Sequence, residues 1–347
     1  MEDSLDQRFH YRVGRRPLVT SKQLVRALFQ RKELSRPPFI PIVTSFAAKL
    51  GQVSVHDLLT NPTRLANTLQ ASQRLFGYDA IVGVYDPSIE AEACGCAIEW
   101  PSEDSLPVVV GHPLAEGKSI PELELDAIDK RGRLPVALEA VKRISMVAGR
   151  DVAMVGTVTG PVSLAVHLRG ETFLDELRNG DKAADDVLEA AGKVLSMLSR
   201  LYCDLKMDAI LVHDEELERI DPALFPKLAP FYLSAANIVR FYDAAFLVFP
   251  GNVHGFNPGT ICQLESDAVM LDNGAVPDAL SLLARQGRSF GAALPPSVLN
   301  GTKELAARAI VDQVSHGSKR GFFLSTSGEI PYATPVENMH EIMRAIK

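Results

Sequence analysis

Hydrophobic residues along this chain are concentrated in eight short runs, separated by longer segments with helical spacing. Each run is apolar throughout, which is typical of parallel strands buried on both faces. The runs are Phe39–Val43, Ala80–Val84, Val152–Gly156, Ala209–Val212, Ala245–Phe249, Ala268–Leu271, Ser289–Leu294 and Phe322–Leu324. Eight strands with intervening helices predict an α/β fold of the (β/α)8 TIM-barrel type. A doubly wound open sheet is the alternative, because periodicity alone does not separate the two.

The segments between the runs carry helix signals. Asn61 and the proline after it start a helix that ends at Gly77, with a cap and a terminator of the preferred residue types. The segment Asp185–Leu205 places its apolar residues at helical spacing. Further helices are predicted over residues 274–286 and 302–314, and from an N-cap at Thr334 onward.

Two segments stand outside this alternation. Residues 87–135 form a long insertion after the second run, with a small hairpin predicted around residues 97–99 and 107–110. Residues 1–36 are locally basic and are predicted as an N-terminal helical extension. Residues 37–347 are then a single TIM-barrel domain.

Composition excludes several classes of protein. The chain has 347 residues, 46% of them hydrophobic, which is enough for a large core. A net charge of −7 argues against general binding to nucleic acid or to an anionic membrane. No apolar run reaches roughly 18 residues, so no membrane span is expected. Four cysteines in a chain this long do not predict a disulfide framework, and a reducing cytoplasm is the expected location.

The site of such a barrel lies at the C-terminal ends of its strands, so the residues that follow each run are the candidates. A small polar turn predicted over residues 325–328 leaves room there for a ligand. The candidates for catalysis are Asp86, His213, Asp214 and Glu329. The candidates for substrate binding are Tyr85, Asn252, Asp272, Ser325 and Tyr332.

The cluster from His213 to Glu216 is the densest of these groups. Imidazole and carboxylates can bind zinc or act as acid and base, whereas the alternative is a solvated acidic start to a helix. A tentative metal set combines His213 and Glu216 with His254. Asp86 has two interpretations as well, as a group that polarises a substrate or as the cap of the turn after it.

Two motifs resemble the uroporphyrinogen decarboxylase superfamily. They are residues 321–339, its C-terminal signature, and residues 79–96, where Asp86 precedes a Glu-Ala-Glu-Ala stretch. That superfamily holds the haem-pathway decarboxylase and many corrinoid- and thiol-dependent methyltransferases, and the resemblance favours the barrel. In its methyltransferases the late turn reads Ser-Thr-Gly-Cys-Glu-Ile-Pro, and the cysteine is a zinc ligand. Gly328 stands there in this chain, and Val248 and Pro250 replace the family's other His and Cys ligands.

The resemblance implies an activity but leaves alternatives. The decarboxylase segment Arg-Gln-Ala-Gly-Arg-Tyr, whose arginines bind propionates, is not found, so uroporphyrinogen is not the expected substrate. The first prediction is a methyltransferase that moves a methyl group between a small O- or N-methyl substrate and a corrinoid (cobalamin) on a carrier protein. It would use either zinc held by altered ligands or acid catalysis without metal. A decarboxylase or lyase of a smaller substrate is the second hypothesis, and a non-catalytic binding protein is the third. A homodimer is expected by family analogy only.

Overall fold

The computed structural model describes residues 19–251, 258–272 and 277–346. Eight strands form one sheet in the order β1-β10-β9-β8-β7-β6-β5-β2, and all hydrogen-bonded neighbours are parallel. Every one of them lies on a hydrophobic run, as predicted. The strands are β1 (Phe39–Ile42), β2 (Ala80–Val82), β5 (Ala153–Thr159), β6 (Ala209–His213), β7 (Ala245–Phe249), β8 (Ala268–Asp272), β9 (Ser289–Leu294) and β10 (Phe322–Glu329).

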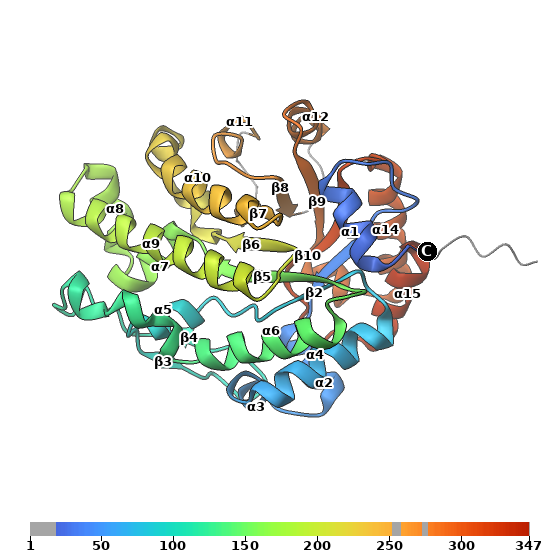
Figure 1. Ribbon diagram of the computed structural model, residues 1–347, viewed down its shortest axis with the longest axis horizontal. Helices are drawn as coiled ribbons and strands as arrows, with labels where there is room; N and C mark the ends of the chain where they lie inside the picture. The colour runs from blue at the N-terminus through green and yellow to red at the C-terminus, as the bar shows by residue number, and fades with distance from the viewer. Residues whose placement is uncertain (1–18, 252–257, 273–276, 347) are drawn as a thin grey trace, which may run out of the picture.

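The sheet curls into a nearly closed barrel with helices around it (Figure 1). β1 and β2 stand at the two ends of the strand order. The Asp79 N–H donates to the Phe39 carbonyl (2.9 Å), and the Phe39 N–H donates to Asp79 Oδ2 (2.9 Å). These bonds tie the two end strands together where they begin. The TIM-barrel prediction is therefore confirmed, and the doubly wound alternative is wrong.

The barrel interior explains why several strands begin with a small residue. Side chains alternate along a strand between the interior and the surrounding helices. The first inward positions of five strands are Ala80, Ala153, Ala209, Ala245 and Ala268. Their small side chains leave room for α1 (Ser21–Phe29), whose buried Leu24, Val25 and Leu28 belong to the same apolar cluster. α1 thus packs on the barrel at the N-terminal ends of the strands, while the division at residue 36 stays a prediction.

The remaining helices bury apolar residues in a second and larger core, which lies on the outer side of the strands. The α-helices are α2 (Thr44–Gly51), α3 (Val55–Thr60), α4 (Pro62–Phe76), α5 (Ile89–Ala93), α6 (Leu134–Ala148), α7 (Pro161–Arg169), α8 (Thr172–Asn179), α9 (Lys182–Asp204), α10 (Phe225–Phe241), α11 (Pro258–Ile261), α12 (Pro277–Arg285), α13 (Pro296–Leu299), α14 (Lys303–His316) and α15 (Val336–Ile346). The 3₁₀ helices are η1 (Ile120–Leu123), η2 (Leu125–Lys130), η3 (Glu215–Arg219) and η4 (Pro222–Leu224). Within the described ranges, no helix has both the length and the apolar character needed to cross a membrane.

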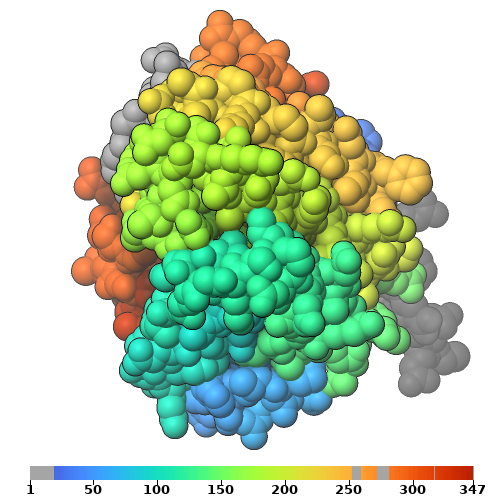
Figure 2. Space-filling model, turned by 90° about the vertical axis from the view of Figure 1, so that its left-hand side faces the viewer, coloured from blue at the N-terminus to red at the C-terminus, as the bar shows by residue number. Residues whose placement is uncertain are grey.

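The insertion after β2 contains the predicted hairpin. β3 (Ile98–Glu99) pairs with β4 (Val108–Val109) in an antiparallel ladder. Figure 2 looks onto the C-terminal ends of the strands and shows the insertion, in turquoise, spread over the lower part of this face. The insertion therefore forms one wall of the region where the candidate residues lie.

One local prediction is wrong. Residues 325–328 do not form a polar turn, because β10 continues through them to Glu329. Ser325 is paired with β1 in register, and its hydroxyl donates to the Ile40 carbonyl (2.7 Å). The Ile42 N–H donates to the Thr326 hydroxyl (3.0 Å). The hydroxyl residues that predicted a turn thus form hydrogen bonds between β10 and β1.

Candidate functional site

The C-terminal ends of the strands bring the candidate side chains of β2, β6 and β10 together. The ring of Tyr85, just after β2, lies 4.7 Å from the ring of His213 at the end of β6. A Cβ atom built at Gly328 in β10 would lie 3.7 Å from the Tyr85 hydroxyl. That hydroxyl donates to Oε1 of Glu215, and burial and the nearby carboxylates raise the pKa of Tyr85. Tyr85 is therefore the central side chain of this site.

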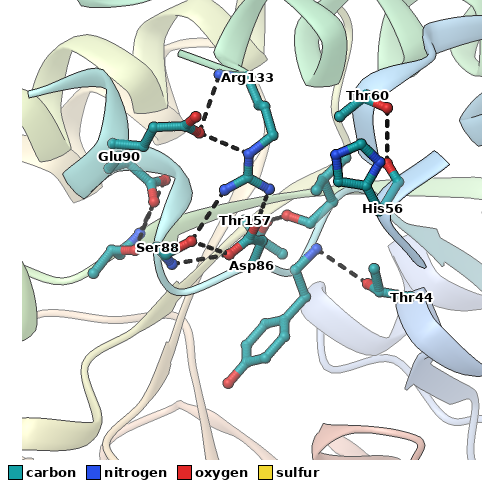
Figure 3. Close-up of polar contacts among 12 residues, drawn as sticks. Thr44, His56, Thr60, Asp86, Ser88, Glu90, Arg133 and Thr157 are labelled. Atoms are coloured by element: carbon teal, nitrogen blue, oxygen red, sulfur yellow. Dashed lines mark hydrogen bonds and ion pairs between the residues drawn. The ribbon is translucent and has the colours of Figure 1, made fainter. Parts of the chain in front are cut away.

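Asp86 forms a buried ion pair (Figure 3). Its Oδ2 accepts from the guanidinium of Arg133, and its Oδ1 accepts from the N–H (2.9 Å) and the hydroxyl (2.8 Å) of Ser88. Arg133 also donates to Ser88 (3.0 Å) and to Glu92 (2.7 Å), and it lies over the ring of Trp100. A buried carboxylate needs such a partner. Asp86 therefore holds the loop after β2, which agrees with its second interpretation as a turn cap.

Asp214 is also engaged within the fold. It is fully buried and accepts hydrogen bonds from the Val162 N–H (3.2 Å), the Ser163 N–H (2.7 Å) and the Tyr232 hydroxyl (2.5 Å). The two N–H groups belong to the first turn of α7, whose donors have no partner within the helix. Burial raises the pKa of Asp214 to about 6 despite these bonds. Asp214 thus caps α7 from a neighbouring strand.

His213 is enclosed and uncharged at neutral pH. Burial, with a smaller contribution from His167, lowers its pKa to about 3. Its Nε2 lies 3.5 Å from the Thr159 hydroxyl at the end of β5. A neutral imidazole has one donor and one acceptor nitrogen. His213 can therefore pass a proton on but does not hold a positive charge.

Glu329 is the most accessible of the four catalytic candidates. It ends β10 and is only partly buried, and its Oε2 accepts from the Ser45 N–H (2.9 Å). Burial raises the pKa of Glu329 to about 7, and repulsion from Asp86 adds to the effect. Its carboxyl group is thus divided between the acid and the carboxylate near neutral pH, as a general acid or base requires.

Glu90 is a site residue that sequence reasoning missed. It lies in α5, is fully buried, and accepts from the Thr159 hydroxyl (2.6 Å) and the Thr159 N–H (3.3 Å). Burial raises the pKa of Glu90 to about 7. The Glu-Ala-Glu-Ala stretch was noticed in the sequence, but a rule that selects strand ends passes over a helical residue. Arg133 was missed because it lies 47 positions from its partner Asp86.

The other predicted residues lie in different settings. Ser325 is fully buried, with its hydroxyl on the Ile40 carbonyl of β1. Burial raises the pKa of the Tyr332 phenol, and the charge of Asp104 and a hydrogen bond to it add to the increase. Glu216 forms an ion pair with Arg219 (2.7 Å). The side chain of Asp272 falls outside the described part of the structure, as do residues Asn252 and His254.

The described residues do not fit a zinc site of their own. Zinc takes three or four ligands from Cys, His, Asp or Glu. Within residues 19–251, 258–272 and 277–346, no three such side chains are grouped to hold a metal ion. His213 and Glu216, two members of the tentative metal set, are engaged by Thr159 and Arg219.

The curated proteins to which this chain is similar in sequence are methyltransferases. The chain is 32% identical over 204 residues to methylcobamide:CoM methyltransferase MtaA of Methanosarcina barkeri, which covers 58% of this chain and 57% of that protein. It is 27% identical over 151 residues to MtbA of Methanosarcina acetivorans, which covers 44% of each. The chain thus spans about half the length of these relatives. A methylated-thiol–coenzyme M methyltransferase of Methanosarcina mazei is 28% identical over 296 residues, covering 82% of this chain and 76% of that protein.

The fold and the family agree with these relatives. The solved structure of a methyltransferase from Methanosarcina mazei superposes with a TM-score of 0.81 at 21% identity, covering 94% of this chain and 98% of that one. A B12-independent methionine synthase from Shewanella superposes less well, with a TM-score of 0.53 at 12% identity over 82% of this chain and 86% of that one. The family model for uroporphyrinogen decarboxylase (URO-D) matches residues 20–347. The chain therefore belongs to the uroporphyrinogen decarboxylase family.

Proposed function

We propose that this protein is a methyltransferase that moves a methyl group between a small O- or N-methyl compound and a corrinoid on a carrier protein. Its relatives MtaA and MtbA are named for transfer between a methylcobamide and CoM. For this protein we infer a corrinoid as one of the two reactants. We do not infer a thiol as the other, because Val248, Pro250 and Gly328 stand where the resemblance expects the zinc ligands that activate a thiol.

The observation that carries the proposal is the carboxyl group of Glu329. An ether or amine donor needs a proton on the leaving oxygen or nitrogen, and a group with a pKa of about 7 supplies it at neutral pH. The methyl carbon loses its bond to that atom and gains a bond to the reduced cobalt of the corrinoid substrate. The cobalt supplies the electron pair, and the proton of Glu329 ends on the leaving atom. In the opposite direction the Glu329 carboxylate accepts the proton of the methyl acceptor.

The neighbouring residues support this role. The Tyr85 ring packs against the His213 ring, and the Glu329 carboxylate is close enough to Tyr85 to contribute to its raised pKa. Neither ring carries a charge at neutral pH. Apolar and aromatic surroundings keep water from an active site and strengthen the electrostatic interactions inside it. Decarboxylation with Asp86 stabilising a protonated ring is less well supported, because Arg133 already neutralises that carboxylate.

The test is a methyl-transfer assay with cob(I)alamin and a panel of methoxy compounds and methylamines. Methylcobalamin absorbance is expected with at least one donor, at a rate that falls as pH rises through about 7 because the acid form of Glu329 is then lost. Glu329→Gln is expected to lower the rate by roughly 10²–10⁴-fold and to remove this pH dependence. Glu304→Gln, on the exposed face of α14, is the matched control and should have no effect.

Two outcomes would contradict the proposal. One is no methylcobalamin from any donor when the natural carrier protein is present. The other is an unchanged rate in Glu329→Gln.

A further inference from the structure

Three buried side chains from three different elements form a continuous chain beside the proposed site. Glu90 of α5 accepts the hydrogen of the Thr159 hydroxyl at 2.6 Å, and the oxygen of that hydroxyl lies 3.5 Å from Nε2 of His213. All three residues are at most 2% exposed. Buried polar groups in such a chain polarise one another. The proposed mechanism does not use Glu90, although it is an ionisable group.

We propose that Glu90, Thr159 and His213 form a proton relay, in which Glu90 stores a proton that enters or leaves the site at Nδ1 of His213. The relay belongs to the site of the proposed function and rests on it for its purpose. Glu90 and Thr159 are positioning residues in this scheme, because they act on the site through His213.

The geometry determines the form of His213 when Glu90 is ionised. The Thr159 hydroxyl has one hydrogen, and at 2.6 Å it is given to Glu90. Towards His213 the hydroxyl oxygen then offers only a lone pair. Nε2 of His213 must therefore carry the hydrogen, and Nδ1 is left as the acceptor nitrogen.

A single proton reverses the chain without leaving a charge on the imidazole. It binds to Nδ1 of His213, while the hydrogen of Nε2 moves to the Thr159 oxygen and the hydroxyl hydrogen moves to Oε2 of Glu90. One proton has entered, one more is held by Glu90, and His213 is neutral again with its hydrogen on Nδ1. The reverse sequence returns the proton to the site.

The surroundings of Glu90 are suited to this storage. Burial is the main cause that raises its pKa to about 7, and the Asp86 carboxylate adds a smaller increase. Burial also raises the pKa of the Cys94 thiol at the end of α5 and of the Tyr202 phenol of α9, so both are neutral. Arg133 is held by Asp86 and Glu92. Glu90 thus changes its charge near neutral pH while its uncharged neighbours do not.

The experiment follows the two ring nitrogens of His213 by NMR in the full chain labelled with ¹⁵N-histidine. The chain has eight histidines, so a His213→Gln sample assigns the signal. At pH 8.5 Nδ1 is expected in the range of an unprotonated nitrogen. Below pH 6 the hydrogen is expected on Nδ1, with a midpoint near 7 and no imidazolium at any point.

The variants separate a relay from simple packing. Glu90→Gln and Thr159→Val should each abolish the change of tautomer, and Thr159→Ser should restore it, because serine keeps the hydroxyl. If Glu90→Gln does not fold, the comparison of Thr159→Val with Thr159→Ser decides. A tautomer that stays constant in the natural chain, or a transition that persists in the folded variants, would overturn the proposal. The measurement needs no methyl donor, so a working relay without methyl transfer would count against the proposed function alone.

Discussion

Four acidic side chains near the C-terminal ends of the strands, Asp86, Asp214, Glu90 and Glu329, differ in the partners that the fold gives them. Asp86 is neutralised by Arg133, and Asp214 caps α7. Among the residues that the structure describes, no cation contacts Glu90 or Glu329, and burial brings the pKa of each to about 7. A carboxyl group that is half protonated at neutral pH can donate or accept a proton, whereas one held in an ion pair cannot. The two glutamates are therefore the groups on which the proposed methyl transfer and the proposed relay depend.

Asp214 provides the residue-scale prediction. Asp214→Ala leaves the Val162 and Ser163 N–H groups and the Tyr232 hydroxyl buried without an acceptor, and each such group costs roughly 1–3 kcal/mol. A loss of about 3 kcal/mol or more in the free energy of unfolding is expected from urea denaturation. Tyr232→Phe removes only one donor and should cost about 1 kcal/mol. Equal, small losses in both variants would contradict the capping role.

Selecting strand-end residues found Tyr85, Asp86, His213 and Glu329 in the sequence, and the structure places these side chains at one end of the barrel. Whether each of these side chains is protonated, or held by a partner, could not be predicted from the sequence. Whether a carboxyl group can titrate or is held in an ion pair depends on the cation beside it. Arg133 lies 47 positions from Asp86, and only the fold of the insertion brings the two side chains together. Glu90 was missed because it lies in a helix and not at a strand end, and its partner Thr159 belongs to another element.

At the scale of elements, sequence signals predicted the structure correctly where the hydrogen-bonding partners are close together in the sequence. The Asn61 side chain accepts from the N–H groups of Thr63 and Arg64 and starts α4, and Gly77 ends that helix, both as predicted. The hydroxyl residues of β10 were misassigned because their partners lie in β1, about 285 positions away. A local signal for a turn was overridden by pairing between strands.

The start of α7 gives a prediction at this scale. Gly160 precedes the helix, and a Cβ atom there would lie 2.2 Å from Cβ of Asp214, closer than packed atoms can approach. Gly160→Ala must therefore push β6 and α7 apart, and we expect a loss of about 2 kcal/mol or more in the free energy of unfolding. Gly180→Ala, with nothing within 4 Å but a φ of +74°, should cost only about 1 kcal/mol of backbone strain. Similar losses would show that contact with Asp214 is not the cause.

At the scale of the whole molecule, closure of the barrel depends on Asp79. This residue is fully buried between β1 and β2, and its carboxylate accepts from the Phe39 N–H (2.9 Å), from two nitrogens of Arg36 (2.7 Å each) and from the Ser21 hydroxyl (3.1 Å). One side chain therefore joins the two end strands of the sheet to α1. Elsewhere in the sheet, continuous strand ladders hold neighbours together.

Asp79→Asn should loosen this seam. Removing one charge of a buried pair typically costs about 3–5 kcal/mol, so we expect a loss of about 3 kcal/mol in the free energy of unfolding. Amide hydrogen exchange should become faster in β1 and β2 before it does in β6 or β7. Asp57→Asn, in an exposed pair with Arg64, is the matched control and should change stability by less than about 1 kcal/mol. Uniform exchange across the barrel would refute a local seam.

The sequence by itself determined the eight strands and the strand ends at which polar residues gather, because buried parallel strands require continuous apolar runs. The runs left a barrel and an open sheet as alternatives, and the family resemblance favoured the barrel. Its two motifs also identified the family. Only the tertiary structure decided which acidic side chains are neutralised and which remain titratable. It also decided that Thr159 connects Glu90 to His213. These properties depend on burial and on partners brought together from distant parts of the chain. Local residue patterns carry no information about which distant residues will meet. The fold decides this by bringing together β2, β5, β6, β10 and the insertion.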